Sequence, residues 1–130
     1  MVTKQTHLLW NPQDKRTLED SNGNQVQNVV ASDLLPMALM GCATHDVVEI
    51  LIKQRQDLRE IKVTAEHTQD DDPPWRFRKI HLKYQIFGKG ISIEKAQKAI
   101  KLSEEKYCAV YVTLKDAVEI THEVEVVEVE

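Results

Sequence analysis

The chain has 130 residues, 17 of them basic and 21 acidic, and a net charge of −4. This length suits one domain, which we expect to span residues 1–130. The acidic balance argues against nucleic-acid binding, which normally needs a basic surface. No stretch reaches the roughly 20 apolar residues of a membrane span, and the N-terminus lacks the apolar core of a signal peptide. We therefore expect no membrane association and a cytoplasmic location, where thiols stay reduced.

The N-terminal third is polar and predicts only short strands. Residues 6–10 (THLLW) are a first candidate, and residues 15–30 (KRTLEDSNGNQVQNVV) predict two more strands around a turn. Asn22 and Gly23 form the strongest hairpin signal in the chain, because an Asn-Gly pair suits a tight turn between antiparallel strands.

A long helix is expected to begin near Ser32 or Asp33 and to run to about Gln56. With Asp33 as N-cap, Pro36 falls in the first turn, where its missing N–H would have had no partner within the helix. The helix has a wide apolar face, formed by Leu34, Leu35, Ala38, Leu39, Cys42, Val47, Val48, Leu51 and Ile52.

Two alternating segments, residues 58–67 (LREIKVTAEH) and 75–90 (WRFRKIHLKYQIFGKG), predict a pair of strands. Trp75 and Phe77 have the opposite parity to the apolar residues that follow them. Either a bulge near Lys79 resets the strand, or the two aromatic side chains cover another surface such as a second subunit.

A second helix, capped by Ser92, is predicted over residues 93–107, and residues 109–117 are compatible with a helix or a strand. Residues 118–130 alternate valine and glutamate and predict a terminal strand. The order of elements indicates an α+β fold with mostly antiparallel sheet packed on two helices.

The residues most suggestive of chemistry lie inside the long helix, in PMALMGCATHDVVEIL (residues 36–51). Cys42 is accompanied there by Gly41, His45 and Asp46. Cys42 could be a packed apolar residue, since free cysteines are often buried. It could bind zinc with His45 and Cys108. It could also form a redox pair with Cys108, in which a sulfenic acid on one sulfur is captured by the other thiol. The helix pattern alone leaves all three open.

Two segments together resemble the OsmC/Ohr family of osmotically inducible and organic-hydroperoxide-resistance proteins. The first is SDLLPMALMGCATHDVVEILIKQRQDL (residues 32–58), an apolar helix with a Gly-Cys pair followed by Asp-Val-Val. The second is AIKLSEEKYCAVYVTL (residues 99–114), a helix that ends in Lys-Tyr-Cys. The resemblance covers residues 31 to about 115 and includes the strand pair between the two segments.

This resemblance implies an OsmC-like α+β fold built as an intertwined homodimer. It also implies thiol-dependent reduction of organic hydroperoxides without a metal or another cofactor. Cys42 would be the attacking cysteine and Cys108 the resolving one. An external dithiol would then reopen the disulfide by exchange.

Family members also hold the thiolate with an arginine from the N-terminal region and a glutamate shortly before the first cysteine. Arg16 is the only N-terminal arginine here, and Asp33 is the only acid near the position of that glutamate. We take both as weaker candidates, together with His45. The alternative function is a non-catalytic dimer that binds an apolar ligand or responds to redox state.

Overall fold

A computed structural model describes all 130 residues, which form two structural units, residues 1–34 and residues 35–130. The N-terminal unit holds a three-stranded antiparallel sheet in the order β1 (His7–Trp10), β2 (Arg16–Glu19) and β3 (Gln25–Gln27). The predicted hairpin is confirmed between β2 and β3. At its turn the Asp20 carboxylate accepts hydrogen bonds from the backbone N–H groups of Asn22 (2.8 Å) and Asn24 (2.9 Å). Gly23 supplies the positive φ of 87° that this turn requires.

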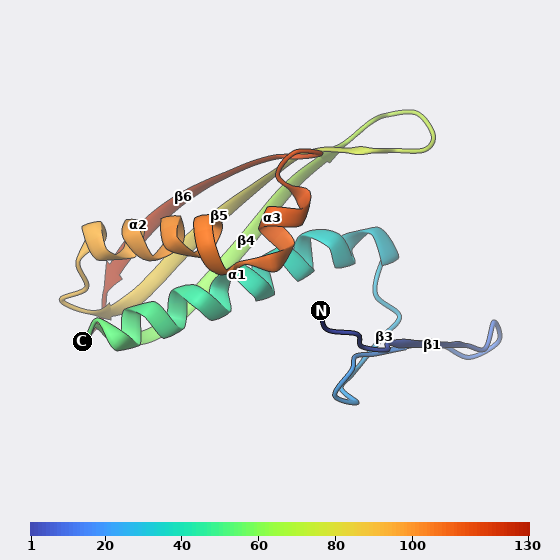
Figure 1. Cartoon of the computed structure of the whole chain (residues 1–130), viewed down its shortest axis with the longest axis horizontal. Helices are drawn as coiled ribbons and strands as arrows, with labels where there is room; N and C mark the ends of the chain where they lie inside the picture. Colours follow the sequence, from blue (N-terminus) through green and yellow to red (C-terminus); the bar gives the residue numbers. More distant parts are fainter. The chain divides into compact units, whose positions relative to one another are not determined.

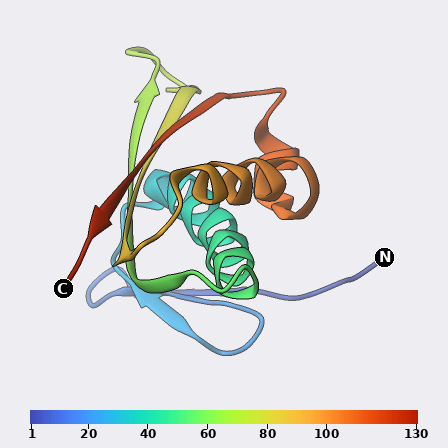
Figure 2. The ribbon, with the colours of Figure 1, turned by 90° about the vertical axis from the view of Figure 1, so that its left-hand side faces the viewer.

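The second unit is a three-stranded sheet covered on one face by helices (Figures 1 and 2). Its strands are β4 (Asp57–Gln69), β5 (Phe77–Lys89) and β6 (Glu119–Glu128), with β5 in the centre. Helices α1 (Leu34–Lys53) and α2 (Ile93–Leu102) lie on the same side of the sheet. The π-helical turn η2 (Ser103–Tyr107) and the short helix α3 (Ala109–Leu114) then lead into β6. The α+β class is thereby confirmed.

One strand pairing differs from the predicted antiparallel arrangement. β4 and β5 pair antiparallel, but β6 pairs parallel to β5. The segment between β5 and β6 crosses back over the sheet through α2, η2 and α3. β6 therefore starts at the same end as β5, and a crossover of this kind is what a parallel pair needs.

The start of α1 also differs from the sequence-based expectation. A 3₁₀ turn, η1 (Ala31–Asp33), leads into the helix, and its N-cap is Val30, with no side-chain cap hydrogen bond. Asp33 lies inside this turn, where its N–H donates to the Val30 carbonyl at 3.0 Å. Asp33 is therefore not the N-cap. The helix ends at Lys53, before the predicted Gln56, because Arg55 adopts a positive φ of 58°.

Trp75 and Phe77 have the opposite alternation to the apolar residues that follow them because the pairing of β4 with β5 shifts by one residue at this point. Lys79 pairs with Thr68 and Phe77 with Gln69, so Arg78 is the extra residue on β5. The bulge predicted near Lys79 is confirmed. Phe77 consequently packs against the core, whereas Trp75 lies in the preceding loop and is 53% exposed.

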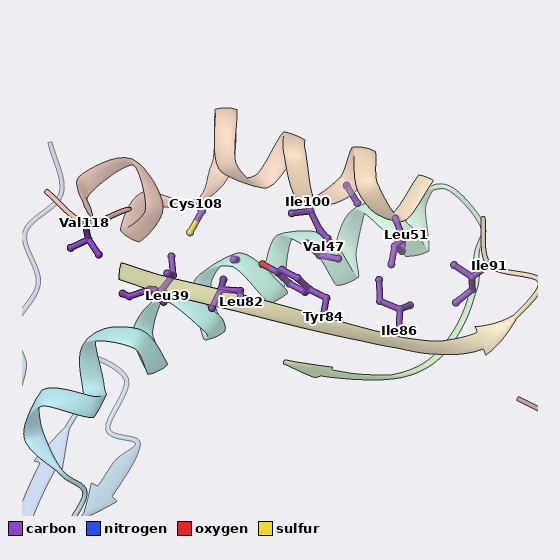
Figure 3. Close-up of a cluster of buried hydrophobic side chains, with 14 residues drawn as sticks. Leu39, Val47, Leu51, Leu82, Tyr84, Ile86, Ile91, Ile100, Cys108 and Val118 are labelled. Carbon is purple, nitrogen blue, oxygen red and sulfur yellow. The ribbon is translucent and has the colours of Figure 1, made fainter. Parts of the chain in front are cut away.

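The core lies between the sheet and the two long helices (Figure 3). The helical segment Ala31–Lys53 is long and apolar enough, by length and composition alone, to cross a membrane, a test that the core helix of a soluble protein also passes. In this fold its inward stripe packs on the sheet instead. The fully buried side chains are apolar apart from one serine, and the largest are Tyr84, Leu39, Leu51, Ile80, Ile86, Ile100, Val47, Pro36, Cys108 and Ser103.

Candidate active site: two thiols between helices

Cys42 and Cys108, far apart in the sequence, lie near each other inside the second unit. Cys42 lies in the middle of α1 and is half-buried, while Cys108 lies between η2 and α3 and is fully buried. The Cys42 thiol is close enough to Cys108 to raise its pKa, and neither cysteine is in a disulfide. In Figure 3 the Cys108 sulfur points from the loop after η2 toward α1. Two free thiols near each other are what disulfide formation starts from.

The environment of Cys108 disfavours its thiolate. Burial raises the pKa of the Cys108 thiol to about 11, and the neighbouring Cys42 thiol and Asp46 carboxylate act in the same direction. The backbone N–H of Tyr111 donates to the Cys108 sulfur at 3.4 Å and partly opposes this pKa shift. Cys108 therefore stays protonated near neutral pH.

A buried hydrogen bond holds the two cysteine-bearing segments together. Ser103, the first residue of η2, is fully buried, and its hydroxyl donates to Asp46 Oδ2 at 3.1 Å. The same hydroxyl lies 3.4 Å from the Ala43 carbonyl oxygen. Asp46 follows Cys42 by one helical turn, and Ser103 precedes Cys108 by one π-helical turn. The contact thus fixes α1 to η2 directly beside the thiols.

A second polar group lies next to the thiols on the sheet side. Glu104 accepts a hydrogen bond from His122 Nδ1 at 2.6 Å, and Tyr111 also hydrogen-bonds to its carboxylate. Tyr84, from the central strand, is buried. Its pKa is raised by burial and by the charges of Glu104, Cys108 and Asp46. The ring of His122 meets the Tyr84 ring edge-on, with centroids 6.3 Å apart.

Of the weaker candidates, His45 belongs to the second unit, and Arg16 and Asp33 belong to the N-terminal one. His45 is at the surface, with 69% of its side chain exposed and its Nε2 3.4 Å from Glu49. No group of three or more His, Cys, Asp and Glu side chains is placed to hold a metal ion, so the zinc set of Cys42, His45 and Cys108 does not form. In the N-terminal unit, the Arg16 guanidinium donates to the Val29 carbonyl at 3.0 Å and stacks over Trp10 at 5.3 Å.

The sequence reasoning did not assign a role to Asp46, Ser103, Tyr84 or Glu104. The four-residue spacing of Cys42 and Asp46 was a usable signal, because residues at i and i+4 share a helix face. Ser103 and Glu104 gave no such signal. Their positions depend on the π-helical turn, whose i→i+5 bonding shifts the face that each residue presents.

Residues 28–123 match the family described as OsmC-like protein. Protein YhfA of Escherichia coli strain K12 is 38% identical over 95 residues, which cover 73% of this chain and 71% of YhfA. The chain therefore belongs to the OsmC-like family, as its sequence resemblance predicted.

Solved structures show the same fold. A hypothetical protein from Aquifex aeolicus VF5 is 26% identical, with a TM-score of 0.84 over 98% of this chain and all of that one. An organic hydroperoxide resistance protein from Elizabethkingia anophelis is 15% identical, with a TM-score of 0.70 over 98% of each chain. At that identity the second likeness concerns the fold alone.

Proposed function

We propose that this chain is a thiol peroxidase that reduces organic hydroperoxides. The observation that carries the proposal is that two free thiols, Cys42 and Cys108, come from segments far apart in the sequence and lie close enough for one to act on the other. The substrate class is taken from the resemblance to the OsmC/Ohr family, to whose OsmC-like model the chain matches. We place the reaction in the cytoplasm, where reduced thiols are maintained.

The two cysteines take different roles because their surroundings differ. Cys42 is half-buried, so a peroxide can reach its sulfur, whereas Cys108 is enclosed and keeps its proton. The Cys42 sulfur attacks the terminal peroxide oxygen, which breaks the O–O bond and gives a sulfenic acid and an alcohol. Cys108 then displaces water from the sulfenic acid and forms the disulfide. An external dithiol restores both thiols by exchange.

The proposal is tested by intact mass under non-reducing conditions, before and after brief exposure of the reduced protein to cumene hydroperoxide. We expect the loss of two hydrogens per chain, faster than with hydrogen peroxide. Cys42→Ser abolishes turnover. Cys108→Ser instead accumulates a sulfenic acid that a dimedone probe captures. Undiminished turnover in Cys42→Ser, or two intact thiols in the wild type, contradicts the proposal.

A second candidate function is the binding of an apolar ligand. It is favoured by a cavity of about 160 Å³ within the N-terminal unit, whose lining is almost wholly apolar. The lining includes Leu8, Trp10, Leu18 and Leu34. Native mass spectrometry of the purified protein distinguishes the two functions. A copurified apolar molecule together with unreactive thiols favours binding, and an empty protein with reactive thiols favours catalysis.

A further inference from the structure

We propose that Asp46 is the proton carrier of the dithiol site. Its carboxylate takes the thiol proton of Cys42 as the sulfur attacks and returns it to the departing alkoxide. This inference rests on the peroxidase function proposed above.

The position of Asp46 is the first observation. It lies one helical turn after Cys42, so their β-carbons are about 6 Å apart on the same face of α1. The Asp46 carboxylate is also close enough to Cys108 and Tyr84 for its charge to act on both. No other carboxylate acts on the Cys108 thiol in this way. Asp46 is thus a carboxylate that shares a helix face with Cys42 and whose charge acts on Cys108.

The orientation of Asp46 is the second observation. One carboxylate oxygen, Oδ2, accepts the hydrogen bond from the fully buried Ser103 hydroxyl at 3.1 Å. This bond fixes the carboxylate and leaves its other oxygen available. An oriented carboxylate can hold a proton without the reorganisation that a mobile one requires.

Access to Asp46 is the third observation. It lines an open pocket of about 210 Å³, together with Ile50, Leu102 and Tyr107, and with Glu49 and Lys53 further along α1. Cys42 does not line this pocket, which begins at Asp46, one helical turn further along α1, and its walls offer room for the organic part of a hydroperoxide. The alkoxide formed at the Cys42 sulfur would then lie within reach of the protonated Asp46.

The reaction balances with this single carrier. The Cys42 thiol gives its proton to the Asp46 carboxylate, and the S–O bond forms while the O–O bond breaks. Sulfur is oxidised by two electrons and the peroxide is reduced by two. Asp46 protonates the alkoxide, which leaves as the alcohol. In the second step the S–S bond with Cys108 forms, and the thiol proton leaves with hydroxide as water.

The test compares two reactions of Cys42 in the Cys108→Ser background, where Cys42 is the only thiol. Asp46→Asn keeps an oxygen that accepts the Ser103 hydrogen bond but cannot carry the proton. Both reactions need the thiol proton to be removed, but iodide leaves without a proton, whereas cumene hydroperoxide releases an alkoxide that must receive one. We expect sulfenic acid formation to slow about 100-fold. We expect alkylation to change by no more than about tenfold, because the loss of the base slows it, the loss of a negative charge beside the sulfur speeds it, and no proton is returned.

The matched control is Glu105→Gln. It removes a carboxylate from η2, the π-helical turn that carries Ser103, where Glu105 is exposed and lies 3.8 Å from Lys101, and it should leave both rates unchanged. If both rates rise together in Asp46→Asn, the residue is only a local charge and the inference is overturned. Equal rates in Asp46→Asn and its parent overturn it as well. If the parent itself fails to react with the peroxide while it is still alkylated, the proposed function fails, and the inference fails with it.

Discussion

At the scale of single residues, two chemically identical side chains become different reagents. Cys108 is buried in the core and lies near the negative charge of Asp46. Both effects raise the pKa of its thiol to about 11, above the ordinary value near 9. Cys42, by contrast, is half-buried. The division of roles between attacking and resolving cysteine therefore follows from burial, which penalises the charged thiolate.

The raised pKa of Cys108 predicts an alkaline loss of stability. The folded chain holds this proton more tightly than the unfolded chain, so stability falls as the pH rises through the ordinary thiol value near 9, and the loss is complete above about 11. The loss is at most about 3 kcal/mol, since a difference of one in pKa is worth about 1.4 kcal/mol. Thermal unfolding under reducing conditions at pH 8 and pH 11 measures it. Cys108→Ala should show a smaller decrease, and an equal decrease in both proteins would contradict the prediction.

At the level of helices and strands, the site depends on where α1, η2 and α3 begin and end. The π-helical turn η2 lets Ser103 reach Asp46, and the next residues bring Cys108 to the N-cap of α3. The end of α1 is similarly fixed. The Gln56 N–H donates to the Leu51 carbonyl and the Arg55 N–H to the Ile52 carbonyl, which is a Schellman motif. The direction of β4 is set by this motif, and β4 in turn pairs with the central strand.

Gly88, near the end of β5, lies where the packing of β5 against Asp57 and Ile91 leaves no space for a side chain. A β-carbon at this position would overlap the Asp57 carbonyl oxygen and the Ile91 side chain. We expect Gly88→Ala to lower the free energy of unfolding by about 2 kcal/mol, because backbone cannot yield as a flexible side chain does. Urea denaturation measures the loss.

Gly41→Ala is the matched control for this substitution. A β-carbon at Gly41 meets nothing within 4 Å, and the residue lies in the interior of α1. We expect a gain of about 0.5–1 kcal/mol, the helix preference of alanine over glycine. Equal changes in the free energy of unfolding for the two substitutions would contradict the prediction that crowding at Gly88 excludes a side chain.

At the scale of the whole molecule, the N-terminal sheet has no core of its own. One face of this sheet carries Leu8, Trp10, Leu18 and Val26, yet no residue of the three strands is buried. Trp10 is 58% and Leu8 59% exposed. A small sheet with an uncovered apolar face is marginal in water. We propose that a second copy of the chain covers this face, as the predicted homodimer requires.

This proposal gives a test of assembly. Size-exclusion chromatography with light scattering should give twice the chain mass of 15.0 kDa. Leu8→Asp places a charge on the apolar face and should shift the protein toward the monomer, with at least a tenfold weaker dimer. Thr17→Asp, on the opposite face of the same sheet, is the control and should leave the dimer intact. A monomeric wild type would contradict the homodimer.

The sequence by itself determined the elements and the family. The Asn22–Gly23 turn, the alternating strand pair and the bulge before the central strand follow from local chemistry, because turn geometry and side-chain alternation depend on near neighbours. The same local rules, with the resemblance, singled out Cys42 and Cys108.

How these residues are used depends on contacts between segments far apart in the chain. The parallel direction of β6, the proximity of the thiols and the bond from Ser103 to Asp46 join segments far apart in the chain. Such contacts arise when a helix and a π-helical turn pack on one sheet. Their geometry depends on the shapes of all the packed surfaces together, and no local pattern encodes it. The surface position of His45, three residues from Cys42, was decided in the same way.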